Sequence, residues 1–221
     1  MNARRMILLN VILLLILVGG GFAAYYYYTN SVNYLKTDNA QITGQQVTIA
    51  ATANGQLTDW KGDVGEKFKK GDEIGTIHPA GAAVPGAPAP KTIKIKAPAD
   101  GTVVQKSAVK DSFVAAGTPL AQMYDLENLW VTANIEETSI NDVKKGQDVD
   151  VYVDAYPGST LTGTVDQIGY ATAGTFSLMP SSNTSGNYTK VTQVIPVKIK
   201  LDNYKGLDIV PGMNVTVRIH K

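Results

Sequence analysis

Cysteine is absent from the 221-residue chain, and histidine occurs only at positions 78 and 220. Without thiols there are no disulfides, thiolate zinc sites, iron–sulfur clusters or cysteine nucleophiles. Two histidines are too few for an all-histidine metal site. We therefore expect no cofactor and no bound metal. We expect His78 and His220 at an exposed turn and near the chain end rather than in a catalytic triad.

The chain also lacks an excess of charge of either sign, because 20 Lys and Arg residues balance 19 Asp and Glu residues. Proteins that bind nucleic acid usually carry a basic surface, so nucleic acid is not an expected partner. The phosphate-binding, dinucleotide-binding, zinc-protease and nucleophile-elbow motifs do not occur. The chain is therefore not expected to be an enzyme. An anchored hydrolase that uses His78 or His220 as its base is the enzymatic alternative.

One long apolar run is present, and it lies near the N-terminus. Residues 6–24 carry no charge, and their length fits the roughly 17–25 residues that cross a bilayer. Tyr25–Tyr28 extend this segment with rings suited to the membrane interface. We therefore predict a transmembrane anchor over residues 6–28, with a cleaved signal peptide as the alternative.

The positions of basic residues around the anchor predict its orientation. Arg4 and Arg5 precede the anchor, and the first basic residue after it is Lys36. The positive-inside rule then places residues 1–5 in the cytoplasm. The chain is expected in the cell membrane as a single-pass protein whose C-terminal part is extracytoplasmic.

An internal repeat follows the anchor, and it aligns residues 49–57 with residues 95–103 at an offset of 46. Apolar residues alternate before each repeat glycine, as expected for half-buried strands. Asn-Gly and Asp-Gly pairs signal tight turns with positive φ, and a second glycine turn follows in each copy. The expected turn residues are Asn54, Gly55, Gly71, Asp100, Gly101 and Gly117.

The repeat and the pattern after it predict a mainly β fold with two domains behind the helix. Residues 29–125 are expected to form a β-sandwich from two halves, about 40–77 and 93–125, joined by a Pro/Ala/Gly connector over residues 78–92. Apolar residues alternate again after residue 126, which predicts a small antiparallel β-barrel over residues 126–221. The one helical candidate there is 139–145, with Ser139 or Thr138 as its N-cap and Gly146 as its end.

A long polar loop between two predicted strands, residues 169–188, is a candidate partner surface. It is rich in Gly, Ser, Thr and Asn, and loops of this length are often functional. Its large side chains follow no strand period and either cap the barrel or contact a partner. The candidate residues are Phe176, Leu178, Met179 and Tyr188.

The two half-motifs resemble the biotinyl/lipoyl carrier fold, so the sandwich is expected to be lipoyl-like. In carriers the joining hairpin presents a lysine for modification. Here the connector holds a single lysine, Lys91, between Pro90 and Thr92, which is not the carrier pattern.

A wider resemblance covers nearly the whole chain. The anchor, residues 37–43, 129–136, 186–199 and the closing segment 211–219 are similar to the membrane fusion (periplasmic adaptor) family, especially its HlyD/EmrA-like branch. This resemblance implies a non-enzymatic adaptor subunit of a multidrug or small-molecule efflux system. It also implies a homo-oligomer and docking on an integral-membrane exporter, of the major-facilitator type more than the ABC type.

The chain departs from this family pattern in its connector. The family inserts a long coiled-coil hairpin between the lipoyl halves, whereas residues 78–92 contain no heptads. This departure argues against contact with an outer-membrane channel. An anchored extracytoplasmic module that binds a ligand or cell-wall fragment without a pump is the alternative function.

Overall fold

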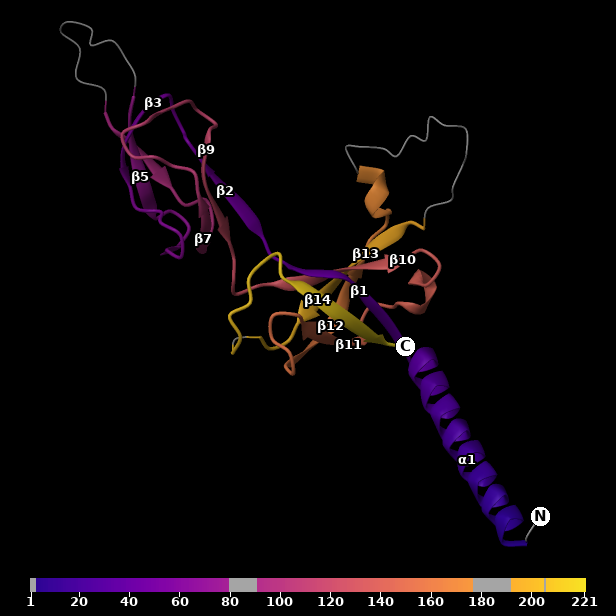
Figure 1. The fold of residues 1–221 in the computed structure, drawn as a ribbon. Coiled ribbons are helices and arrows are strands. Elements are labelled where there is room, and N and C mark those ends of the chain that lie inside the picture. The colour runs from indigo at the N-terminus through magenta and orange to yellow at the C-terminus, as the bar shows by residue number, and fades with distance from the viewer. Residues whose placement is uncertain (1–2, 80–90, 177–191, 205) are drawn as a thin grey trace, which may run out of the picture. The chain divides into compact units, whose positions relative to one another are not determined.

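The computed structural model describes residues 3–79, 91–176, 192–204 and 206–221, which form two compact units (Figure 1). One unit contains Met1–Gln41, Val131–Tyr204 and Met213–Lys221. The other contains Ile42–Trp130 and Lys205–Gly212. The second unit is therefore inserted into the sequence of the first.

A single long helix, α1 (Ala3–Asn33), opens the first unit. Its segment Asn10–Thr29 has 20 residues and is the one described helix long and apolar enough to cross a membrane. The side chains from Asn10 to Tyr28 are all exposed, and apolar residues lie on every side of the helix rather than on one stripe. Such a helix has no polar face for water, which is the composition that a hydrocarbon core accommodates.

The second unit is a sandwich of two four-stranded sheets, with strand orders β2-β9-β7-β4 and β6-β5-β3-β8. Its core side chains come from both sheets. Leu57 and Ile77 from one sheet and Val103 and Met123 from the other are each at most 1% exposed. The strands are β2 (Gln46–Ala50), β3 (Gly55–Trp60), β4 (Lys67–Phe68), β5 (Glu73–Pro79), β6 (Ile93–Lys96), β7 (Gly101–Lys106), β8 (Phe113–Val114) and β9 (Pro119–Tyr124).

The two repeat copies are interleaved rather than stacked as one copy per sheet. Strands β2–β5 come from the first copy and β6–β9 from the second, and each sheet takes two strands from each copy. Two backbone hydrogen bonds between the copies join positions that are equivalent under the offset of 46. The N–H of Gly117 donates to the carbonyl of Ala51, and the N–H of Gly71 donates to that of Ala97, both at 2.8 Å. Neither copy therefore contains a complete sheet.

The first unit contains a closed six-stranded barrel with the order β1-β10-β13-β12-β11-β14. Its interior is filled by alternating residues such as Val151 on β11 and Val217 on β14, both 0% exposed. Closure leaves no free strand edge, which suits strands this short. The strands are β1 (Tyr34–Thr43), β10 (Trp130–Glu136), β11 (Asp148–Val153), β12 (Thr160–Ile168), β13 (Val194–Leu201) and β14 (Asn214–His220).

Strand β1 closes the barrel although it precedes the sandwich in the sequence. It pairs antiparallel with β14, with Tyr34 opposite His220 and Gln41 opposite Asn214. The sequence pattern had grouped this segment with the sandwich. The partner strand lies at the other end of the chain, so local periodicity does not identify it.

The helical candidate at 139–145 is a single 3-10 turn, η1 (Ile140–Asp142). Ser139 occupies its N-cap position but makes no side-chain capping bond, and Val143 is already extended. A segment this short does not sustain an α-helix. A second 3-10 turn, η2 (Ala173–Phe176), lies within the polar loop over residues 169–188. The predicted fold class, mainly β with an N-terminal apolar helix, a sandwich and a small antiparallel barrel, is confirmed.

Candidate interaction surfaces

Two of the predicted turn residues, one in each repeat copy, form side-chain hydrogen bonds with the backbone of the other copy. Oδ1 of Asn54 accepts a hydrogen bond from the N–H of Ala116 at 2.8 Å. Oδ1 of Asp100 accepts one from the N–H of Lys70 at 2.6 Å. Each of these side chains caps the glycine turn of the other copy.

The four glycines of the turns serve two different purposes. Gly71 and Gly117 have φ of 95° and 87°, as expected for glycine turns. Gly55 and Gly101 do not have positive φ, because they begin strands β3 and β7, so the primed-turn interpretation of these two positions is wrong. A Cβ at Gly55 would overlap the carbonyl oxygen of His78, and one at Gly101 would lie 2.9 Å from that of Tyr124. Glycine is needed at both positions for close approach of a neighbouring strand.

The candidate partner loop lies mostly outside the described residues. Leu178, Met179 and Tyr188 fall in residues 177–191, which the structure does not describe. Phe176 is the last residue of η2. The role of this loop as a partner surface therefore stays a prediction.

A β-bulge in β1 was not anticipated from the sequence. The register between β1 and β14 shifts between Thr37 and Ala40. Thr37 Oγ1 donates to the carbonyl of Asn134 at 3.1 Å and accepts from the N–H of Asn39 at 3.2 Å. The Asn134 amide donates to Oδ1 of Asn39 at 3.0 Å, so side chains hold the bulge in place.

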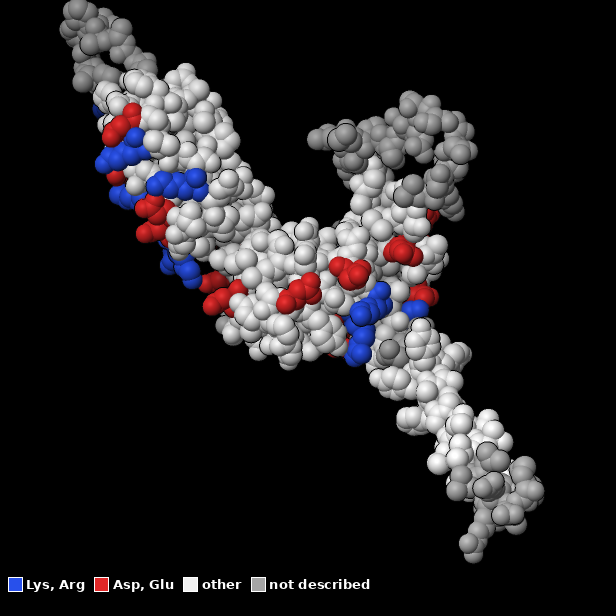
Figure 2. Space-filling model, viewed as in Figure 1, with Lys and Arg blue, Asp and Glu red and all other residues white. Residues whose placement is uncertain are grey.

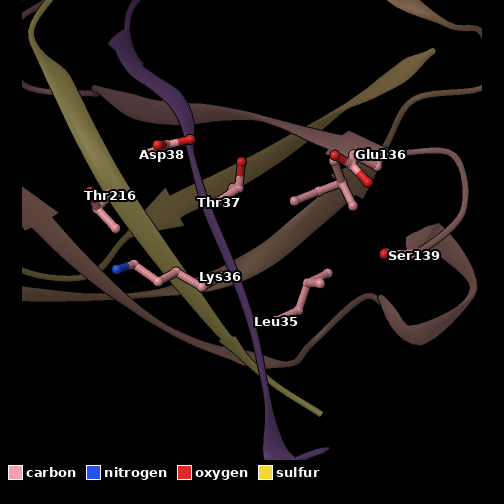
Figure 3. A pocket seen from close by; sticks show the side chains of 8 residues that line it. Leu35, Lys36, Thr37, Asp38, Glu136, Ser139 and Thr216 are labelled. Carbon is pink, nitrogen blue, oxygen red and sulfur yellow. The ribbon is translucent and has the colours of Figure 1, made fainter. Parts of the chain in front are cut away.

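A pocket of about 510 Å³ lies at this bulge (Figure 3). The buried Ile135 contributes to its lining, which also carries both signs of charge. Figure 3 shows Asp38 and Glu136 on opposite sides of β1, so the two carboxylates do not converge as metal ligands would. The pocket is lined by Leu35, Lys36, Thr37, Asp38, Ile135, Glu136, Ser139 and Thr216.

Charged and aromatic side chains form a connected cluster on the outer face of the barrel. Arg218 donates to Oδ2 of Asp150 through Nε at 3.1 Å and through Nη2 at 2.9 Å. Nε2 of His220 lies 3.0 Å from the same oxygen and donates to it, because an ionised carboxylate only accepts. The Tyr34 ring contacts both, with the Arg218 guanidinium carbon 4.2 Å from its centroid and the His220 ring in an edge contact at 4.9 Å.

This cluster sets the charge state of Asp150. Burial acts to raise the pKa of Asp150, but the hydrogen bonds from His220 and Arg218 outweigh it, and the pKa lies below its usual value. The hydrogen bonds that Arg218 donates to Asp150 raise the pKa of Arg218. The carboxylate therefore stays ionised and keeps both donors. Sequence patterns did not identify this cluster, since its members lie on β1, β11 and β14.

Charged side chains also mark the surface of the sandwich. Figure 2 shows Lys, Arg, Asp and Glu gathered along one side of this unit. Lys94 of the edge strand β6 pairs with Glu73 at 2.6 Å, and Lys106 pairs with Asp63 at 2.6 Å. Lysines on an edge strand oppose pairing with a foreign strand, so β6 is protected against β-addition.

The two histidines differ in their surroundings. His78 is an exposed residue of β5, whereas His220 belongs to the Asp150 cluster. The two lie in different units of the structure.

Comparisons with known proteins agree with this two-unit fold. Residues 45–125 match the family model of the YhbJ barrel-sandwich hybrid domain, and residues 129–219 match that of the YknX-like beta-barrel domain. The chain is 45% identical over 219 residues to the putative efflux system component YhbJ of Bacillus subtilis (strain 168), which covers 99% of this chain and 94% of that protein.

More distant relatives share part of the chain or the fold alone. The chain is 38% identical over 127 residues to the colistin resistance protein EmrA of Acinetobacter baumannii, covering 57% of this chain and 36% of that protein. It therefore matches about a third of that relative's length. A solved structure of the periplasmic adaptor protein EmrA has a TM-score of 0.54 at 14% identity, covering 86% of this chain and 99% of that one.

An apolar N-terminal helix, a barrel-sandwich hybrid and a closed β-barrel define an adaptor-type protein. The chain belongs to the membrane fusion protein (HlyD-type adaptor) family, whose members are generally non-enzymatic. The resemblance drawn from the sequence is confirmed.

Proposed function

We propose that this chain is the membrane-anchored adaptor subunit of a multidrug or small-molecule efflux system. It docks on an exporter in the inner or cytoplasmic membrane and works there as a homo-oligomer. The observation that carries the proposal is the match to YhbJ along 99% of the chain, which includes the helix and both β units. The names of the EmrA relatives, which concern colistin resistance and multidrug export, support small-molecule efflux.

Helix α1 supplies the anchor in this proposal. Its apolar segment ends at Thr29, and the first barrel strand begins at Tyr34. So short a connection keeps the barrel beside the membrane, which raises its local concentration at an exporter in the same bilayer. With residues 1–5 in the cytoplasm, the sandwich and barrel are extracytoplasmic.

The exporter supplies the energy, and the adaptor supplies contact surfaces. A major-facilitator exporter is proposed over an ABC exporter because of the resemblance to the EmrA-like branch. The bulge pocket, with Lys36, Asp38 and Glu136 on its rim, offers polar groups for contact close to the anchor. The polar loop over residues 169–188 is proposed as a further partner surface.

No outer-membrane channel is included in the proposal. The connector between the sandwich halves has 15 residues, 78–92, and contains no heptad pattern. A coiled-coil hairpin long enough to reach a distant channel needs far more residues at 1.5 Å each.

Co-purification of the full-length protein in mild detergent tests the proposal. We expect an integral-membrane exporter of the major-facilitator type in the purified complex. A variant in which residues 6–24 are replaced by an unrelated spanning helix controls for anchoring alone. Recovery of the adaptor by itself after gentle crosslinking contradicts the proposal and favours an anchored binding module. Recovery with an ABC exporter contradicts only the exporter class.

A further inference from the structure

The junction between α1 and the barrel contains no linker. The helix ends at Asn33 and β1 begins at Tyr34. Tyr34 is paired with His220 in the ladder between β1 and β14, and the N–H of Lys221 donates to the carbonyl of Asn33 at 2.9 Å. The last helical residue and the first strand residue are therefore both held by the end of β14.

The Tyr34 side chain adds a second attachment at this junction. The Arg218 guanidinium lies over the face of its ring at 4.2 Å, which is cation–π geometry. The His220 ring lies nearly perpendicular to it, at an interplanar angle of 88°. Two different contacts thus hold one ring.

Asp150 connects these two contacts to the next strand. A single carboxylate oxygen on β11 accepts from Arg218 and from His220, and the Asp150 side chain is only 20% exposed. Arg218 lies between Lys36 of β1 and Asp150 of β11 in the strand register. The contacts therefore extend over three adjacent strands.

The tyrosines of α1 lack such surroundings. Tyr25–Tyr28 are each at least 66% exposed, whereas Tyr34 is half-buried. A tyrosine that only contacts the membrane–water interface does not need a guanidinium and an imidazole beside its ring. Tyr34 differs from these four tyrosines in its contacts with Arg218 and His220.

We infer that Tyr34, Arg218, His220 and Asp150 form a junction clamp that makes α1 and the barrel move as one body. Rotation about the backbone of one or two residues is enough for a hinge. The clamp removes this freedom by fixing the first side chain after the helix. A displacement of the helix in the membrane is then passed to β14 and β11.

The absence of native cysteine permits a direct test by spin labelling. Tyr28→Cys on α1 and Thr162→Cys on β12 replace exposed residues outside the clamp. The distribution of distances between the two labels is measured in the full-length protein in lipid nanodiscs. We expect a narrow distribution in this background and one about twofold wider after Tyr34→Ala, because the hinge is released.

Two further variants separate the clamp from general destabilisation. Tyr34→Phe keeps the ring and is expected to keep the narrow distribution. Tyr170→Ala removes a tyrosine that is 100% exposed and is expected to leave it unchanged. If Tyr34→Ala unfolds the barrel by circular dichroism, Arg218→Gln and His220→Gln are measured instead, and they are expected to broaden the distribution.

An equally broad distribution in the background, or no broadening in Tyr34→Ala and in the two alternative variants, overturns the inference. This readout needs no exporter. Its failure is therefore distinct from failure of the proposed efflux function.

Discussion

Asn54 accepts a hydrogen bond from the backbone N–H of Ala116, which is 62 residues later in the chain, at 2.8 Å. In the same way, Asp100 of the second repeat copy accepts a hydrogen bond from the backbone N–H of Lys70 in the first copy. The two bonds are equivalent under the repeat offset of 46. Each copy of the repeat therefore stabilises a turn of the other, in keeping with the interleaved strands of the sandwich.

Removing these caps is expected to weaken the sandwich. Asn54→Ala leaves the Ala116 N–H without its partner and is expected to lower the free energy of unfolding by about 1 kcal/mol. Asp100→Ala is expected to lower the free energy of unfolding somewhat more, since the acceptor that it removes is a charged carboxylate. Denaturant unfolding of the full-length protein in detergent measures both. Asn203→Ala replaces an exposed asparagine as a control, and equal stability of all three variants contradicts this role.

Alanine is expected to be tolerated differently at Gly55 and Gly71. At Gly55 the new methyl group meets the backbone oxygen of His78, which cannot move without breaking the pairing of β3 and β5. We expect a loss of about 3 kcal/mol there. At Gly71 the space is open and only the positive φ opposes alanine, so the expected loss is about 1 kcal/mol. Thermal unfolding gives the order, and a reversed order refutes the close-approach account.

The junction clamp predicts an acid-dependent contribution to stability from Asp150. The pKa of Asp150 is lowered in the folded protein, so its ionised form is stabilised by folding. This stability is present above the ordinary carboxyl pKa and is lost as the pH falls through the lowered value. Asp150→Asn is therefore expected to flatten the decline of the unfolding midpoint between about pH 5 and pH 2.

Glu73→Gln serves as the matched control for this pH profile. A hydrogen bond from Lys94 lowers the pKa of Glu73 as well, but this pair lies on the surface, where solvent screens it. Its profile is expected to follow the wild type. An unchanged profile in Asp150→Asn shows that the cluster does not stabilise the barrel through its charge.

The proposed topology predicts which introduced cysteines react from outside the cell. Val109→Cys, at a position that is 64% exposed in the sandwich, is expected to react with a membrane-impermeant maleimide while the cytoplasmic membrane is intact. Asn2→Cys is expected to react only after lysis. The reverse pattern contradicts the proposed orientation. A mature protein that begins near Ala24 shows a cleaved signal instead of an anchor.

Local patterns in the sequence predicted most of the fold. The offset of 46 identified the sandwich, and alternation such as Val149, Val151 and Val153 identified barrel strands whose buried face the structure confirms. Strand partners were not predictable in the same way. Tyr34 and His220 are opposite each other in the barrel, yet no periodic pattern connects positions so far apart.

The candidate sites were predicted less well for the same reason. Asn54 and Asp100 carry a local turn signal, but the groups that they bind belong to the other repeat copy. The Asn-Gly and Asp-Gly pairs also suggested positive φ at glycines that are needed for close strand approach. The Asp150 cluster combines three strands, and each of its members alone has the pattern of an ordinary surface residue.

Drug susceptibility in a strain that lacks this protein tests the efflux account most directly. Full-length protein, a variant without residues 6–24 carried by a cleavable signal, and an empty vector are compared with and without the co-purified exporter. We expect the full-length protein to restore resistance only when the exporter is present, and the anchorless variant to restore much less. Resistance that the protein restores without any exporter contradicts the account.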